Sequence, residues 1–210
     1  MKLVLAWNEK VNLTAITDED DFITKHFIDS VSCAVFDELV NADTVIDVGA
    51  GAGFPGVPLS LVFPDKQFLL IDSTGKKIKI LKEIADALEL PNVKLVQSRA
   101  EDLARKEGYR ESFDVCVSRA VARLAALSEY CLPFVKIGGC FIAYKGAGAD
   151  GELKEAKNAI AILGGEIDGI RTPRLEGFDF DHNLTVVKKT RKTPGKYPRN
   201  AGIPTKNPLR

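Results

Sequence analysis

Short apolar runs alternate with amphipathic segments along most of the chain. Runs rich in β-branched residues, typical of strands buried on both faces of a sheet, occupy residues 44–48, 67–72, 93–97, 113–118 and 139–145. Segments with helical periodicity lie at residues 18–40, 56–63, 76–89, 101–107, 121–132 and 151–163. This alternation predicts an α/β fold with a Rossmann-like, doubly wound parallel sheet.

The pattern changes near the end of the sequence. Two further predicted strands, at residues 166–171 and 184–189, are separated by a loop rather than by a helix, so they can pair as an antiparallel hairpin at one edge of the sheet. The last residues contain four prolines, and we expect no regular structure there. The chain thus divides into an N-terminal helical segment (1–40), a central domain (41–190) and a tail (191–210).

A glycine-rich turn follows the first predicted strand. Gly49, Gly51 and Gly53 are spaced two residues apart, and their lack of Cβ atoms lets a ligand approach the backbone closely. Gly56 then begins a predicted helix, whose unpaired N–H groups favour a negative or polar group. A strand, a glycine turn and a helix in this order are typical of α/β enzymes that hold an adenosine-containing cofactor.

Two side chains at the turn distinguish between such cofactors. The dinucleotide pattern G-x-G-x-x-G is matched by Gly51, Gly53 and Gly56. Asp47, just before the turn, would repel a pyrophosphate but would attract the cationic amino-acid group of S-adenosylmethionine (SAM). Phe54 adds bulk where a pyrophosphate needs room. These residues favour SAM over a nicotinamide or flavin dinucleotide, and a structural turn without a ligand is the remaining interpretation.

Two candidates come from neighbouring segments. Asp72 ends the second predicted strand, where its carboxylate can accept hydrogen bonds from both ribose hydroxyls. Together with Ser73 it can instead cap the next helix, but its distance from the glycine turn favours ribose binding. His26 lies on one face of the first predicted helix, where it is either structural or part of the pocket rim.

Ligands in open α/β sheets bind beyond the carboxyl ends of the strands. After the third predicted strand, backbone groups around Ala100 and Glu101 can contact adenine, or this segment simply begins a helix. After the fourth, Arg119 and Arg123 can bind a carboxylate, a phosphate or a guanine, or they are solvated at the surface. After the fifth, Lys145 is a further substrate-binding candidate.

Composition limits the class of protein. The chain has 210 residues, 45% of them hydrophobic and 28% charged, which suits one globular unit. No apolar run approaches the roughly 20 residues of a membrane span, so we expect no membrane contact. Four cysteines without close pairing and only two histidines argue against a metal site and favour reduced thiols in a cytoplasmic protein.

Charge is unevenly distributed, although the formal net charge is zero. Residues 188–210 contain eight basic residues and no acids, which suggests a polyanionic partner. Lys192, Lys196, Tyr197 and Arg199 interleave basic and aromatic side chains, which can combine phosphate contacts with base stacking. We therefore expect the tail to contact RNA, and a solvated, disordered end is the alternative.

Motifs over nearly the whole chain resemble those of the bacterial 16S ribosomal RNA guanine-N7 methyltransferases, once called glucose-inhibited division protein B. The matching segments are Trp7–Thr14, His26–Ser30, Asp47–Gly56, Asp72–Ser73, Gln97–Glu101, Ser118–Ala120, Lys145–Gly146 and Lys196–Arg199. The resemblance implies a class I SAM-dependent methyltransferase with residues 41–190 as the SAM-binding domain. It also implies that the SAM pocket includes Gly49, Phe54, Ala100, Glu101 and Arg119.

The resemblance further implies methyl transfer to a guanine N7 in the decoding region of the small ribosomal subunit. Family members usually carry another helical segment before the Trp-Asn motif, whereas six residues precede Trp7 here, so we expect a shortened N-terminus. N7 has a lone pair and no proton, so alignment can suffice and no general base is needed. We expect Arg119 to position the reactants, and we expect a monomer that acts on 16S rRNA or on the small subunit.

Three other functions are compatible with parts of the sequence. A SAM-dependent methyltransferase of small molecules would share the glycine turn, but the basic tail argues against it. An oxidoreductase of the dinucleotide-binding class is a further alternative, but this sequence has no obvious catalytic pair of a histidine and an acid. A ribosome assembly factor with a vestigial pocket would not need Asp47, Asp72 and Arg119.

Overall fold

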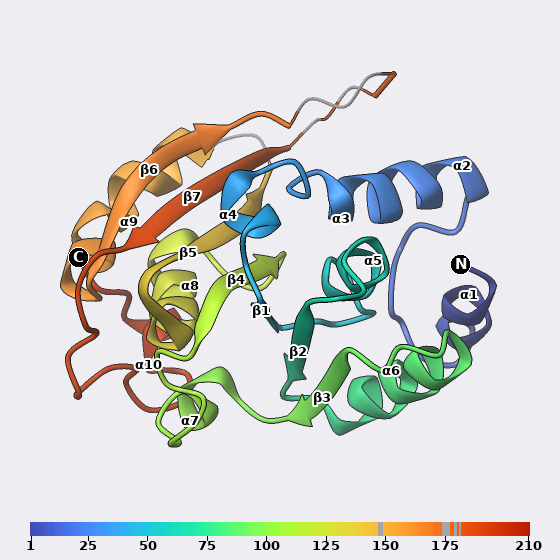
Figure 1. The fold of residues 1–210 in the computed structure, drawn as a ribbon, viewed down its shortest axis with the longest axis horizontal. Helices are drawn as coiled ribbons and strands as arrows, with labels where there is room; N and C mark the ends of the chain where they lie inside the picture. The colour runs from blue at the N-terminus through green and yellow to red at the C-terminus, as the bar shows by residue number, and fades with distance from the viewer. Residues whose placement is uncertain (147–148, 174–176, 179, 181) are drawn as a thin grey trace.

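The computed structural model describes residues 1–146, 149–173, 177–178, 180 and 182–210. A seven-stranded sheet in the order β3-β2-β1-β4-β5-β7-β6 runs through its centre (Figure 1). Its strands are β1 (Thr44–Val48), β2 (Gln67–Asp72), β3 (Val93–Gln97), β4 (Phe113–Arg119), β5 (Val135–Lys145), β6 (Gly165–Arg171) and β7 (Asn183–Lys189). β1 to β5 are parallel, whereas β7 is antiparallel to both β5 and β6. The predicted doubly wound sheet with an antiparallel C-terminal hairpin is confirmed.

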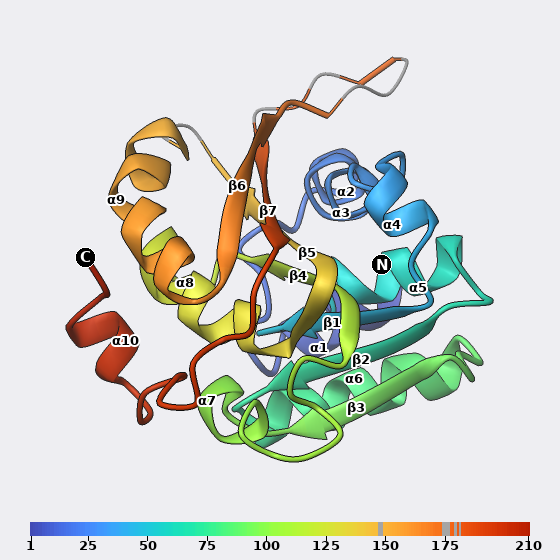
Figure 2. The same ribbon diagram turned by 60° about the vertical axis from the view of Figure 1, so that its left-hand side comes forward.

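Helices cover both faces of this sheet (Figures 1 and 2). One face packs against α1 (Lys2–Asn8), α2 (Glu19–Phe22), α4 (Asp37–Val40), α5 (Gly56–Val62) and α6 (Gly75–Ala87). The other packs against α7 (Ala100–Leu103), α8 (Leu124–Cys131), the 3-10 turn η2 (Leu132–Phe134) and α9 (Ala149–Ile162). Successive strand side chains point to opposite faces, so Val45 joins the first apolar cluster and Ile46 the second.

The segment predicted as one helix over residues 18–40 is broken into short pieces. After α2 comes a π-helical stretch, η1 (Ile23–Ile28), followed by α3 (Asp29–Val31), a turn and α4. The hydroxyl of Ser30 donates to the carbonyl of His26, four residues earlier. Such bonds compete with the helical backbone bonds and bend helices, which accounts for the irregular turn at this point.

Two predicted boundaries shift for local reasons. α8 begins at Leu124 rather than at residue 121, because Arg123 has an extended backbone with φ of −62° and ψ of 149°. β5 begins at Val135 rather than at residue 139, and its pairing with β4 changes register near Gly139. A Cβ atom at Gly139 would clash with the carbonyl oxygen of Asp114, so glycine allows the two backbones to approach there.

The tail contains regular structure, contrary to the expectation from its prolines. A short helix, α10 (Ile203–Lys206), carries Pro204 in its first turn, where a missing N–H has no cost. Tyr197 is 7% exposed and belongs to the apolar cluster that includes α8. The tail therefore packs on the body of the protein instead of extending from it.

Candidate active site

A cavity of about 430 Å³ lies at the carboxyl ends of the central parallel strands. Gly49, Asp72, Ser73, Ala100 and Glu101, all predicted as cofactor-binding residues, line this cavity. They come from the loops after β1, β2 and β3 and from the first turn of α7, which the parallel sheet brings to one edge. We call this space the first cavity.

The glycine turn forms one wall of the first cavity with its backbone. Gly49 has a φ of +79°, and a Cβ atom there would collide with Cγ2 of Val121. The N–H of Gly51 donates to Oδ2 of Asp72 over 3.1 Å, which joins the turn to the end of β2. Gly53 lies outside the lining, because it packs closely against Val57.

Asp72 has donors on both oxygens and still faces the cavity. Its Oδ1 accepts the N–H of Thr74 over 2.8 Å, and its Oδ2 accepts the N–H of Gly51. Lys77 Nζ lies 3.9 Å from Oδ2. Each carboxylate oxygen has a second lone pair, so this arrangement is compatible both with the predicted turn-capping role and with hydrogen bonds from ribose hydroxyls.

Asp47 does not line the cavity, contrary to the prediction of direct contact with the cofactor. It is fully buried beneath the turn, where its Oδ2 accepts the N–H of Gly56 over 2.9 Å. Its Oδ1 has no hydrogen-bond partner among the described residues. Burial raises the pKa of Asp47 to about 7, although the Gly56 hydrogen bond and the charge of Arg119 act in the opposite direction.

Phe54 also lies outside the first cavity. Its ring stacks on His26 with the ring centroids 4.6 Å apart and the planes 4° apart. The guanidinium group of Arg119 lies 5.3 Å from the centre of the same ring. Phe54 is 7% exposed, so it supports these two side chains instead of forming cavity wall.

A second cavity, of about 310 Å³, adjoins the first at the ends of β4 and β5. Arg119, Lys145, Tyr144 and Asp29 contribute to its lining, and Ala120 lines both cavities. The positive φ of Ala120 is uncommon for a residue with a side chain, and such strain is frequent at functional sites. The two cavities are therefore neighbours on either side of the loop after β4.

Arg119 is held in the second cavity by a polar network. Its Nη1 is 2.5 Å from Oδ2 of Asp29, and its Nη2 is 3.1 Å from Nδ1 of His26. Nδ1 of His182 is 2.5 Å from the other oxygen of Asp29. Burial opposes ionisation of Asp29, but His182 and Arg119 outweigh it and lower the pKa of this carboxyl.

His26 is neutral at physiological pH. Burial and, secondly, the charge of Arg119 lower its pKa to about 4. Because Arg119 donates to Nδ1, we place the ring proton on Nε2, which lies 2.6 Å from the hydroxyl oxygen of Thr14. Both ring nitrogens are thus engaged, and His26 lies beside the second cavity as a support for Arg119.

Two other predicted substrate residues, Lys145 and Arg123, differ in their position relative to the cavities. Lys145 lines the second cavity, where its Nζ donates to the carbonyl of Ala122 over 2.7 Å and lies 2.8 Å from Glu152. Arg123 lines neither cavity and forms an exposed ion pair with Glu155. Arg123 therefore lies away from both cavities.

Comparisons with known proteins agree with this geometry. The chain matches the GidB family, rRNA small subunit methyltransferase G, over residues 1–173. The Ribosomal RNA small subunit methyltransferase G of Clostridium perfringens is 50% identical over 99% of this chain and 87% of that protein. The same enzyme of Clostridium kluyveri is 52% identical over 97% of this chain and 85% of that protein. This chain belongs to the GidB family.

Solved structures show the class of fold to which this GidB-family protein belongs. An O-methyltransferase family protein from Burkholderia thailandensis superposes with a TM-score of 0.61 at 13% identity, over 78% of this chain and 55% of that one. TYW2 of M. jannaschii in complex with AdoMet gives 0.58 at 16% identity, over 76% and 72%. The fold is that of a class I SAM-dependent methyltransferase, and SAM is the cofactor of this family.

The residues of the first cavity fit SAM. Gly49 lines this cavity with its backbone at a positive φ, and any side chain there would collide with Val121 in the loop after β4. Asp72 offers carboxylate lone pairs to ribose hydroxyls. The unpaired Oδ1 of Asp47 beneath the turn favours a cationic group over a pyrophosphate. Among the described residues, no group of three or more His, Cys, Asp or Glu side chains is placed to hold a metal ion.

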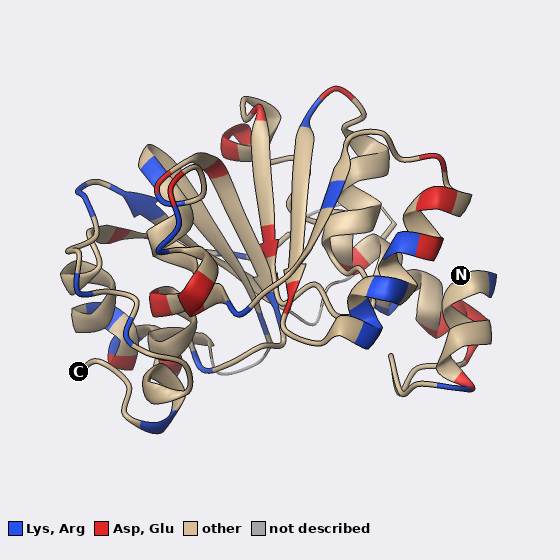
Figure 3. Ribbon diagram, turned by 90° about the horizontal axis from the view of Figure 1, so that it is seen from below, with Lys and Arg blue, Asp and Glu red and all other residues tan. Residues whose placement is uncertain are grey.

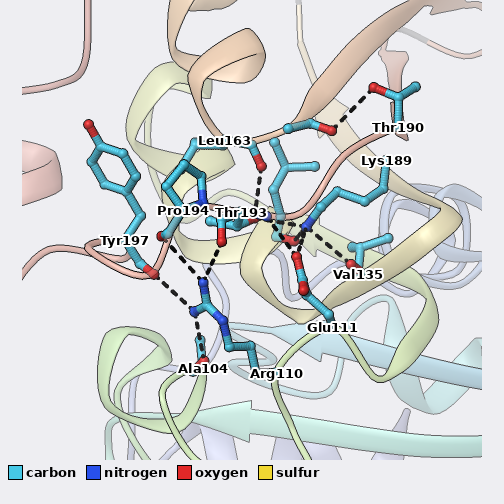
Figure 4. A network of polar contacts seen from close by, with 12 residues as sticks. Ala104, Arg110, Glu111, Val135, Leu163, Lys189, Thr190, Thr193, Pro194 and Tyr197 are labelled. Atoms are coloured by element: carbon cyan, nitrogen blue, oxygen red, sulfur yellow. Dashed lines mark hydrogen bonds and ion pairs between the residues drawn. The ribbon is translucent and has the colours of Figure 1, made fainter.

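The tail of the GidB-family protein is anchored through buried charges (Figure 4). Lys189, at the end of β7, is 1% exposed, and its Nζ lies 3.1 Å from Oε1 of Glu111 and donates to the hydroxyl of Thr193 over 2.8 Å. Arg110 donates to the carbonyls of Thr193 and Tyr197 over 2.8 and 2.9 Å. Burial lowers the pKa of Lys189, although Glu111 acts against this effect.

Arg199 is also paired with a buried acid. Its backbone N–H and Nε donate to Oε1 of Glu129 over 2.7 and 2.9 Å, and Nη2 donates to Oε2 over 2.7 Å. Glu129 is fully buried in α8 and raises the pKa of Arg199. The burial of Tyr197 likewise contradicts the expectation that its ring is accessible for base stacking, and Lys196 lies over that ring at 5.3 Å.

The tail also completes the first cavity, which the sequence did not indicate. Gly202 and Thr205 line it together with Tyr130 of α8. The N–H of Gly202 donates to Glu101 Oε1 over 3.1 Å, and the hydroxyls of Tyr130 and Thr205 share a hydrogen bond of 2.6 Å. A proline in the first turn is compatible with the start of a helix, but no local pattern reveals the surface on which that helix packs.

Proposed function

We propose that this protein transfers the methyl group of SAM to N7 of a guanine in the 16S rRNA of the small ribosomal subunit. The observation that carries the proposal is the pair of adjoining cavities on either side of Ala120. One has the chemistry for the cofactor, and the other has room and polar groups for a base. Membership of the GidB family supports rRNA as the substrate, and the choice of N7 follows the family resemblance.

The first cavity holds the cofactor through three parts of the chain. Asp72 and Ser73 bind the ribose, the segment at Ala100 contacts the adenine, and the glycine turn at Gly49 holds the amino-acid end. SAM, when bound, supplies an electrophilic methyl group on a positively charged sulfur. The loop containing Ala120 borders both cavities, so the target base and the cofactor meet at that loop.

The residues of the second cavity orient the base instead of exchanging protons with it. N7 of guanine carries a lone pair and no proton, so methyl transfer requires alignment rather than a base catalyst. His26 is no base here, because Arg119 occupies Nδ1 and Nε2 is hydrogen-bonded to Thr14. Arg119 is fixed by Asp29 and presents its guanidinium group to the cavity. It is a positioning residue.

The remaining features of the proposal concern organisation and location. Residues 41–190 form the SAM-binding methyltransferase domain, residues 1–40 support it, and the tail closes its cofactor cavity. The protein acts as a monomer in the cytoplasm, where its ribosomal substrate is found. Among the described residues, no helix has both the length and the apolar character that a membrane span requires.

Methylation of isolated substrates tests this function. The protein is incubated with SAM labelled in the methyl group and with small ribosomal subunits, naked 16S rRNA or a panel of small metabolites, and the products are digested to nucleosides. We expect label in 7-methylguanosine from at least one RNA substrate. Label in another nucleoside overturns the N7 assignment, and label only in small molecules overturns the RNA substrate.

A further inference from the structure

The substrate RNA of the proposed function needs a cationic surface, and part of the basic charge of residues 188–210 is neutralised within the fold. Lys189 and Arg199 are paired with buried or half-buried acids, and Lys188 is 2.7 Å from Asp168. A cation that is neutralised within the fold gains little from a phosphate. Lysines that have no such partner and lie close to the cavities are better placed to bind one.

Three such lysines lie together on one helix, α6. Lys76, Lys79 and Lys82 are exposed and stand three residues apart, which places them along one side of the helix. Among the described residues, none of the three has a carboxylate within 4.0 Å or a hydrogen bond to its side chain. We call these three residues the lysine face.

The order of charges along α6 opposes the helix dipole. The first turn contains no acid and the last turn no base, and the lysines precede Glu83 and Asp86. Figure 3 shows this order as blue bands on the first half of the helix and red bands on the second. A helix prefers acids near its N-terminus and bases near its C-terminus, so stability alone selects the reverse order. Features that work against local stability often serve a function.

The lysine face is also well placed beside the site. α6 follows β2 in a parallel sheet, so its first turns lie at the carboxyl edge, where both cavities open. Lys77, on the side of the helix towards the sheet, lines the first cavity together with the exposed Arg99. With a rise of about 1.5 Å per residue, the three lysines span roughly 9 Å of helix, enough for more than one phosphate of a strand.

We propose that the lysine face of α6 is a docking surface for the phosphate backbone of the substrate RNA, beside the strand that delivers the target base. This inference rests on the proposed function, because it requires an RNA substrate. Phosphates replace the carboxylate partners that these lysines lack, and each contact releases counterions. The face therefore contributes affinity and orientation, whereas choice of the base remains with the second cavity.

A matched pair of triple variants tests the inference. The first variant carries K76Q, K79Q and K82Q, and the control carries K192Q, K196Q and K206Q, three exposed lysines of the tail. Both lose the same charge. Binding to 16S rRNA and to small subunits is measured between 50 and 300 mM salt, and SAM affinity and melting temperature are measured alongside.

The expected results separate the two regions. Loss of three phosphate contacts lowers the slope of log affinity against log salt by about two and weakens binding roughly tenfold at physiological salt. The helix variant shows this loss, keeps its SAM affinity and melts at the same or a higher temperature, because it relieves the adverse order of charges. The control changes the slope by less than about one. Replacing the three helix lysines by arginine retains the wild-type slope.

Three results overturn the inference. An unchanged slope in the helix variant excludes the lysine face as a phosphate contact. An equal loss in the control assigns the effect to net charge or to the tail. A lower SAM affinity or melting temperature in the helix variant assigns it to structural damage. If the wild-type protein neither binds nor methylates RNA, the proposed function itself fails, which these measurements distinguish from failure of the lysine face alone.

Discussion

The tail and α6 are two basic regions that use their charges differently. Residues 188–210, which are the end of β7 and the tail, carry eight bases and no acids, so this region has the greater charge in the sequence. In the fold, Lys189 is neutralised by Glu111, and Arg199 by Glu129. The lysine face of α6 has acids close to it in the sequence, yet within the described part of the chain none of its three lysines forms an ion pair.

The difference shows that pairing in space, and not charge along the chain, determines which bases can bind an anion. The acids that pair with the tail come from the loop after α7 and from α8, some 70 to 80 residues earlier. They make the tail part of the protein core and part of the cofactor cavity. The lysines on the exposed side of α6, by contrast, remain accessible to solvent and to a polyanion.

The largest effect is expected from breaking the anchor of the tail. Glu129→Gln leaves Arg199 with a neutral partner in a buried site, which lowers the free energy of unfolding by about 3 kcal/mol. SAM affinity falls as well, because the tail lines the first cavity. Urea unfolding and calorimetry with SAM measure both effects.

The matched control for this variant is Glu155→Gln, which removes the exposed partner of Arg123. We expect a change below about 0.5 kcal/mol there. If the two variants are equally stable, the tail is not held by its buried charge, and the contrast between the tail and α6 is wrong.

The second prediction concerns the glycine turn as a determinant of SAM binding. Gly49→Ala places a Cβ atom against Val121 at a positive φ, which weakens SAM binding roughly a hundredfold. Gly108→Ala has a similar φ of +83° but nothing within 4 Å, so it reports backbone strain alone. Calorimetry that finds equal SAM affinity in both variants would show that the turn does not approach the cofactor.

The third prediction extends the comparison to Asp47, a buried acid whose Oδ1 has no hydrogen-bond partner among the described residues. Its folded-state pKa of about 7 lies above its ordinary value of 3.8, so the protonated form is favoured by folding. Its contribution to stability is complete below about pH 4 and is lost as the pH rises to 7, by at most about 1.4 kcal/mol per pH unit. Asp47→Asn should remove this part of the pH dependence in unfolding measured without SAM. An identical pH profile for both proteins would be inconsistent with a raised pKa.

Much of the central fold can be predicted from the sequence, because its signals are local. Strands β1, β2 and β3 begin and end at the predicted residues, since runs of apolar, β-branched residues between turn signals suffice to place them. Gly49 and Asp72 lie at the cavity as predicted, because the strand, turn and helix fix their positions relative to one another.

The remainder depends on contacts that are distant in sequence. The irregular turn at η1 and α3 involves a single hydroxyl of Ser30, and the burial of Asp47 depends on how α5 begins over it. Tyr130 and Thr205 come from segments 75 residues apart and meet only in the folded chain. The sequence predicts an exposed tail, because the residues near its end give no indication that Lys189 pairs with Glu111 and Arg199 with Glu129.

One measurement tests the central claim most directly, namely that the cavity beyond Ala120 positions a guanine of 16S rRNA for methylation. Initial rates of 7-methylguanosine formation on the preferred RNA substrate are compared for the wild-type protein, Arg119→Ala and Arg123→Ala, with SAM affinity measured in parallel. We expect Arg119→Ala to be roughly a hundredfold slower, because misplacement by about 1 Å can cost that much, and Arg123→Ala to match the wild type. Equal rates for the two variants, or no 7-methylguanosine from the wild type, would contradict the account.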